Sequence, residues 1–188
     1  MINRNQAWDL LTSKLSNKNL VRHCLAVEAV MRELAKYFEA SADKWGIVGL
    51  LHDGDYELSR DDPTKHTLLM HGWLTGMRET DPEILSAILS HNFAHTGKNP
   101  PANKLEWSLY CCDELTGLIV AVALVMPDKK LSSVTPEAVM KKFTQKSFAA
   151  GAHREQIALC EQKLGIKLED FISLSLSAMQ SISPELGI

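Results

Sequence analysis

The sequence predicts an all-α protein, and three observations support this fold class. Apolar residues recur at three- and four-residue intervals along most of the 188-residue chain, as they do in amphipathic helices. Sustained alternation of apolar and polar residues is missing, and no hairpin turn signal separates β-branched runs. Residue pairs that commonly begin helices precede several of the apolar patterns. Typical helix and connection lengths then lead us to expect about eight to ten helices.

The first half of the chain contains one long helical pattern and three shorter ones. The long pattern has an apolar face with steps of four and three residues, made by Leu20, Cys24, Val27, Met31, Leu34 and Phe38. A short apolar helix is expected at 45–51, with Ser41 as its N-cap. Asp62-Pro63 and Asp81-Pro82 each join a capping side chain to a proline suited to the first helical position. We therefore expect a helix after each pair.

The second half begins with another long helix, whose inner face is formed by Leu105, Leu109, Cys112, Thr116, Ile119 and Ala123. The apolar run at 115–126 has 12 residues, whereas a membrane span needs about 20, so this segment is predicted to be a buried helix. Thr135-Pro136 is expected to open a further helix, and Gly165 to end the next one. Residues 168–179 form a last amphipathic pattern.

Composition and charge narrow the class of protein. The chain has 20 Lys and Arg against 23 Asp and Glu, a formal net charge of −3, which disfavours bulk nucleic-acid binding. Hydrophobic residues make up 45%, an ordinary globular proportion. The N-terminal stretch MINRNQAWDLL lacks the apolar run of a signal peptide, and the four cysteines show no CxxC spacing. We expect a cytoplasmic protein with reduced thiols and no membrane segment.

The chain is predicted to fold as a single domain over residues 1–188. No repeat, low-complexity tract or Ser/Gly linker divides it. A shift in composition at 127–130 marks a loop between a core at about 18–126 and C-terminal helices at about 135–182.

Four polar residues lie where the apolar patterns predict burial. His23 borders the apolar face of the first long helix, His52 and Asp53 end the run WGIVGLL, and Asp113 lies on the inner face of the second long helix. Burying an unpaired carboxylate costs several kcal/mol, so Asp113 requires a partner. A divalent cation such as Zn, Mn, Fe or Ni would satisfy all four residues together. A hydrogen-bonded core histidine and a helix cap would explain each one separately, but not their combination.

This set resembles the H…HD…D signature of the HD superfamily of metal-dependent phosphohydrolases. His23 and His52 are 29 residues apart, and Asp53 and Asp113 are 60 residues apart. The flanking stretches LLHDGDYE at 50–57 and DELTGLIVA at 113–121, and KKFTQKSFAAGAHRE at 141–155, are similar to a subgroup of uncharacterised bacterial HD hydrolases. The resemblance covers about residues 18–126. It implies an HD-domain helical bundle with a C-terminal helical extension and a metal at its centre.

Two further histidines extend the resemblance. With His66 and His91 the string becomes H…HD…H…H…D, as in binuclear HD proteins, in which the aspartate of the HD pair bridges two metals. Alternatively, both histidines bind substrate phosphate or water beside a single metal. The resemblance implies one or two divalent ions, drawn from Mn, Mg, Ni, Co, Zn or Fe.

The activity implied is hydrolysis of a small phosphate ester or nucleotide by metal-activated water. Asp53, Asp55 or Glu57 is the expected acceptor of the water's proton. Lys142, Lys146 and Arg154 form a basic cluster that is a candidate for binding the substrate's phosphate. The simpler explanations are a polar turn for Asp55 and Glu57, and solvated surface charge for the basic cluster.

Two other functions remain open from the sequence. One is a di-iron HD oxygenase resembling myo-inositol oxygenase, which would use the same ligands to activate O₂. The other is a non-catalytic HD module that binds a metal or a ligand. The sequence leaves the natural substrate and the oligomeric state open, including a homo-oligomer.

Overall fold

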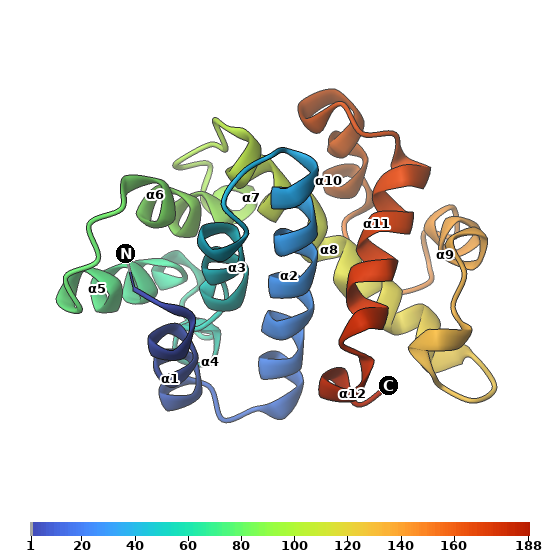
Figure 1. Cartoon of the computed structure of the whole chain (residues 1–188), viewed down its shortest axis with the longest axis horizontal. Helices are drawn as coiled ribbons and strands as arrows, with labels where there is room; N and C mark the ends of the chain where they lie inside the picture. Colours follow the sequence, from blue (N-terminus) through green and yellow to red (C-terminus); the bar gives the residue numbers. More distant parts are fainter. Residues whose placement is uncertain (1) are drawn as a thin grey trace.

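The computed structural model describes residues 2–188, and within this range every regular element is a helix, which confirms the all-α prediction (Figure 1). The first elements are α1 (Arg4–Lys14), α2 (Lys18–Tyr37), α3 (Ala42–Leu51), α4 (Tyr56–Ser59), the 3₁₀ turn η1 (Pro63–Lys65), α5 (Leu68–Gly76), α6 (Pro82–His91) and α7 (Phe93–Thr96). They are followed by α8 (Lys104–Val125), the 3₁₀ turn η2 (Leu131–Ser133), α9 (Pro136–Phe143), α10 (Arg154–Leu159), the π-helical turn η3 (Cys160–Leu164), α11 (Leu168–Ser181) and α12 (Ser183–Leu186).

The core is built around the two longest helices. Helix α2 packs on α3, α8 and α11, while α8 also packs on α6, α9 and α10 (Figure 1). Helix α8 is long and apolar enough to cross a membrane. However, 61% of its most apolar 18-residue stretch is buried inside the fold. That burial is what the core helix of a folded domain shows.

Several helix starts agree with the capping residues in the sequence. The Ser41 hydroxyl accepts a hydrogen bond from Lys44 N at 3.3 Å, and Asp81 accepts one from Glu83 N at 3.0 Å. The Thr135 hydroxyl accepts from Ala138 N at 3.2 Å. At the other end of its segment, Gly165 takes the left-handed conformation that stops a helix, with φ of 76°.

The prediction for Asp62-Pro63 is confirmed for the cap and not for the length of the helix: the Asp62 side chain accepts a hydrogen bond from Thr64 N at 3.3 Å, and Pro63 begins the element. Only the single turn η1 follows, and α5 begins five residues later, after Thr67 in the left-handed region with φ of 70°. The interruption lies where a buried carboxylate, Asp55, receives hydrogen bonds from both His66 and Met70 N. These bonds hold residues 66–70 against the core in an orientation that a continuous helix from Pro63 does not provide.

Helix α1 was not anticipated and lies outside the predicted core at about 18–126. Its Ala7, Leu10 and Leu11 are buried, and the helix packs on α3. A capping box formed by Asn3 and Gln6 begins it. The hydrophobic core therefore starts with the first helix of the chain.

Candidate metal centre

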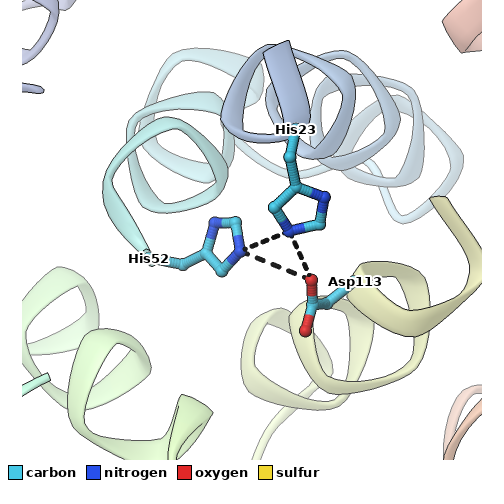
Figure 2. A group of neighbouring side chains, drawn as sticks. All are labelled: His23, His52 and Asp113. Carbon is cyan, nitrogen blue, oxygen red and sulfur yellow. Dashed lines mark hydrogen bonds and ion pairs between the residues drawn. The ribbon is translucent and has the colours of Figure 1, made fainter. Parts of the chain in front are cut away.

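Three of the predicted ligands meet where α2, α3 and α8 come together. His23 lies on α2, His52 caps the end of α3, and Asp113 lies on α8, with their side chains pointing at a common centre (Figure 2). His23 Nε2 is 2.8 Å from Asp113 Oδ1, and His52 Nε2 is 3.4 Å from the same oxygen. The two imidazole Nε2 atoms are 3.2 Å apart. Residues separated by 90 positions in the sequence thus form one cluster.

Asp53 connects this group to a second pair of histidines. Its Oδ2 lies 3.7 Å from Nε2 of His23 and 3.7 Å from Nε2 of His52. Its Oδ1 lies 3.2 Å from Nε2 of His66 and 3.2 Å from Nε2 of His91. The carboxylate therefore presents one oxygen to each pair of imidazoles. All six residues named from the sequence as ligands of one or two metals lie together.

Glycine at position 49 explains how α2 and α3 come close enough. A Cβ on Gly49 would lie 2.9 Å from the Val27 carbonyl oxygen, so glycine lets α3 approach the α2 backbone. A Cβ on Gly54 would lie 2.2 Å from the Met70 side chain, at the turn directly after Asp53. Glycine at position 49 therefore permits the close approach of α3 to α2 beside the cluster, and Gly54 leaves room for the Met70 side chain of α5.

Hydrogen bonds to the other ring nitrogens orient two of the imidazoles. His52 Nδ1 lies 2.8 Å from the Gly49 carbonyl oxygen, and His66 Nδ1 lies 2.8 Å from Asp55 Oδ1. Because both partners are acceptors, we assign the proton to Nδ1 in each ring, which leaves the Nε2 lone pair for the cluster when the ring is neutral. His91 Nδ1 is buried and has no hydrogen-bond partner among residues 2–188.

The charges in the cluster strongly shift its pKa values. Burial lowers the pKa of His23, but the nearby Asp113 and Asp53 outweigh it and raise the pKa of His23 to about 9. His66 behaves in the same way: burial is outweighed by Asp53 and Asp55, which raise its pKa to about 9. Burial disfavours ionised Asp113, yet the neighbouring His23 and His52 hold its pKa well below the usual range. The carboxylates thus create a buried site that attracts positive charge.

The donor set fits a divalent cation. Tetrahedral ligands at about 2.0–2.1 Å from a metal lie roughly 3.3 Å from one another. The five distances given above lie between 2.8 and 3.7 Å; they join pairs of the four candidate ligand atoms His23 Nε2, His52 Nε2, Asp113 Oδ1 and Asp53 Oδ2. Imidazole nitrogen and carboxylate oxygen are ordinary ligands for Zn, Mn, Fe and Ni. This buried His/Asp cluster can therefore hold a metal ion.

A cavity of about 160 Å³ opens beside the cluster. Asp53, His66, His91 and Asp113 form one part of its lining, and the remaining lining residues are Tyr56, Ala94, His95, Tyr110, Glu114 and Gln156. Nothing in the sequence marked the two tyrosines, Glu114 or Gln156 as lining residues. Their residue types carry no distinctive spacing, and only the packing of α10 on α8 brings Gln156 to the cavity.

Two of the three expected proton acceptors lie outside this cavity. Asp55 is fully buried and is already bonded to His66 Nδ1 and Met70 N. The Glu57 carboxylate accepts hydrogen bonds from Ser16 N at 2.9 Å and Asn17 N at 2.8 Å. Asp55 therefore positions His66, Glu57 links α4 to the start of α2, and only Asp53 faces the cavity.

The expected phosphate-binding cluster is also displaced from the site. Lys142, Lys146 and Arg154 do not line the cavity beside the cluster. Lys142 Nζ lies 4.6 Å from the centre of the Phe148 ring, and Lys146 is exposed. The Arg154 guanidinium donates to the carbonyl oxygens of Ala149 and Ala152, both at 2.6 Å, and to that of Phe148. Its role in the structure is to hold the loop before α10.

Comparison with known proteins adds nothing to these observations: no protein-family model, no curated protein and no solved structure matches the chain. The geometry of the site and the spacing of its ligands are therefore the features that bear on function.

Proposed function

We propose that this protein is a metal-dependent phosphohydrolase of the HD type that cleaves a small phosphate ester. The observation that carries the proposal is the position of Asp53, which directs one oxygen to His23 and His52 and the other to His66 and His91. The order of these residues in the chain, together with Asp113, resembles the binuclear HD signature.

The proposal assigns two groups of ligands. His23, His52, Asp53 and Asp113 hold one ion, and Asp53, His66 and His91 contribute to a second. When bound, divalent cations supply hydroxide at neutral pH by lowering the pKa of water towards about 7, and they polarise a phosphoryl oxygen. Imidazole and carboxylate ligands are compatible with Mn, Mg, Ni, Co, Zn or Fe.

The chain's own residues supply orientation and a restricted site. Gly49 and Asp55 fix the tautomers of His52 and His66 through their Nδ1 atoms. The cavity of about 160 Å³ suits a phosphoryl group better than a large substrate. Asp53, as the one expected proton acceptor that lines this cavity, is assigned that role.

Metal analysis and a phosphatase assay test the proposal. Protein purified without chelator should contain up to two divalent ions per chain and should hydrolyse p-nitrophenyl phosphate when loaded with Mn²⁺. Asp113→Asn keeps the size of the side chain and removes its charge, so it should lose an ion and the activity. Asp61→Asn is the matched control, because Asp61 is exposed and lies outside the cavity.

Three results would contradict the proposal. Full retention of metal and activity by Asp113→Asn would show that the ligand assignment is wrong. Two irons per chain with consumption of O₂ and no phosphatase activity would identify an oxygenase instead. Stable metal binding without turnover of any phosphorylated metabolite would favour a binding module.

A further inference from the structure

A groove runs along α8 next to the metal centre. It has a volume of about 420 Å³, and its lining residues, which define the α8 groove, are Asn19, Arg22, His23, Gly117, Val120, Leu124, Leu186 and Ile188. Three of them, Gly117, Val120 and Leu124, follow Asp113 at helical spacing, so the groove continues the face of α8 that carries this ligand.

The groove connects with the metal ligands. A second cavity of about 330 Å³ lies between them, lined by Asp113 and Glu114 together with small residues of the loop before α10. This cavity shares His23 and Gly117 with the α8 groove. It also shares Asp113 and Glu114 with the cavity of about 160 Å³ beside the cluster. A molecule whose phosphate is bound in that smaller cavity can therefore extend past Gly117 into the groove.

Gly117 has no explanation in the packing of the protein. Glycine within a helix is less stable than alanine, and Gly117 lies in the interior of the 22-residue helix α8. A Cβ at this position would meet no atom within 4 Å, whereas a Cβ at Gly49 would contact the α2 backbone. Gly72 in α5 is equally unobstructed, so what distinguishes Gly117 is its position. It lines both the cavity at His23 and Asp113 and the α8 groove, and the missing side chain leaves the path between them open.

The groove walls are chemically different from the metal centre. Val120, Leu124 and Leu186 are apolar, and Leu124 is 49% exposed although α8 is mostly buried. Within residues 2–188 no carboxylate side chain lines the groove, and the side chains there that can carry a charge are those of Arg22 and His23. These walls fit an uncharged apolar group that is attached to an anion.

We propose that the α8 groove binds the apolar alcohol portion of the substrate, so that the substrate is a phosphate monoester of an aromatic or aliphatic alcohol and not a nucleotide. This inference rests on the proposed function, since it places the substrate's phosphate at the metal centre. Gly117 is then a specificity-determining residue, because any larger side chain would occupy the path between the phosphate and the groove.

Binding of phosphonates tests the inference without turnover, because their C–P bond is not a phosphate ester. Mn²⁺-loaded protein is titrated by calorimetry with methylphosphonate and with phenylphosphonate, which share the head group and differ in the apolar part. The wild-type protein should bind phenylphosphonate at least about tenfold more tightly, as expected for burying a ring. In Gly117→Leu this preference should fall below about twofold.

Gly72→Leu is the matched control. Gly72 lies in the interior of α5, is exposed, has no atom within 4 Å of an added Cβ and does not line the α8 groove. This variant should keep the wild-type preference. Gly117→Ala provides a second check, since it should raise the melting temperature through helix propensity while it weakens binding of phenylphosphonate more than that of methylphosphonate.

Each remaining result overturns the inference. Equal binding of the two phosphonates, or a preference that survives Gly117→Leu, would show that the groove does not hold an apolar group. Binding of neither would contradict the metal centre as the phosphate site on which the inference rests. A higher kcat/KM for AMP than for phenyl phosphate would instead identify the substrate as a nucleotide. A dimer that Gly117→Leu dissociates, without any phosphonate preference, would assign the groove to a second copy of the chain.

The assays separate the two proposals. Hydrolysis of p-nitrophenyl phosphate without a phosphonate preference would leave the phosphohydrolase intact and reject the groove. A Gly117-dependent preference without hydrolysis of any phosphate ester would establish the groove and reject the phosphohydrolase.

Discussion

The six candidate metal ligands and the three candidate phosphate-binding cations were identified from the same sequence, but only the metal ligands lie together in the structure. His23, His52, Asp53, His66, His91 and Asp113 converge on one buried cluster. Lys142, Lys146 and Arg154 lie around a loop at 144–153 and do not line the adjoining cavity.

The difference follows from the cost of burial. A polar side chain on the apolar face of a core helix is buried and needs a hydrogen-bonding or charged partner. A neighbouring helix must therefore carry that partner side chain at the same place in the core. Asp113 on α8 is such a residue, and His23 lies 2.8 Å away. A lysine on the surface has no such requirement, because water solvates it wherever the loop leads. Clusters of surface charge in a sequence therefore predict sites less well than isolated polar residues in apolar helices.

The largest effect that tests this comparison is expected for Asp53→Asn. Both groups of imidazoles depend on the Asp53 carboxylate, so the variant should lose both ions and reduce hydrolysis of p-nitrophenyl phosphate by more than about 100-fold, beyond the 10–100-fold typical of losing an outer partner. Elemental analysis and steady-state kinetics measure these changes, and circular dichroism checks the fold. Two ions bound per chain of Asp53→Asn would exclude a bridging carboxylate.

A smaller effect, confined to one half of the cluster, is expected for Asp55→Asn. Asp55 acts through His66, to which it is hydrogen-bonded. Replacing its carboxylate by an amide should therefore lower the affinity for the second ion by about 10–100-fold and leave the affinity for the first ion unchanged. Calorimetric titration with Mn²⁺ resolves the two affinities. The matched control is Glu57→Gln, whose carboxylate bonds Ser16 and Asn17 outside the cavity and should leave both affinities unchanged. A larger effect of Glu57→Gln than of Asp55→Asn would reverse these assignments.

The sequence predicted the helices that carry the ligands because their periodicity and caps are local features. Ser41, Asp81 and Thr135 cap helices as expected, and the apolar faces of α2 and α8 are buried. It did not predict α1, which has no strong apolar face and is ordered by packing on α3. It also misplaced the helix after Pro63, because the bond between Asp55 and His66 joins segments 11 residues apart.

The candidate ligands were predictable for the same reason, and the cavity was not. His23, His52, Asp53 and Asp113 are polar where the apolar patterns predict burial, which is visible in the sequence. His66 and His91 were predicted from the resemblance of the motif, and His66 lies between η1 and α5. The cavity walls depend on contacts between distant segments, such as α10 on α8, which bring Gln156 and Tyr110 together. Nothing in the spacing of those residues distinguishes them from surface positions.

Among the candidate phosphate-binding cations, Arg154→Ala should lower the stability of the protein and leave catalysis unchanged. Its guanidinium bonds the carbonyl oxygens of Phe148, Ala149 and Ala152, and hydrogen bonds to charged groups contribute about 1.5–3 kcal/mol. We expect the free energy of unfolding, measured with urea, to fall by about that amount while metal content stays the same. A tenfold rise in KM with unchanged stability would instead place Arg154 at the substrate.

The smallest effect is expected for Lys146→Ala. Lys146 is exposed, whereas Lys142 has its ammonium 4.6 Å from the centre of the Phe148 ring. Surface substitutions away from specific contacts change stability by no more than about 0.5 kcal/mol, and an exposed cation–π contact contributes about 0.5–1 kcal/mol. Lys142→Ala should therefore destabilise slightly more than Lys146→Ala, and kcat/KM should stay within about twofold for both. If kcat/KM of Lys146→Ala fell tenfold and the loss depended on salt, the loop would have to close over the phosphate during the reaction. The basic segment would then belong to the site, and the comparison would hold only for the free protein.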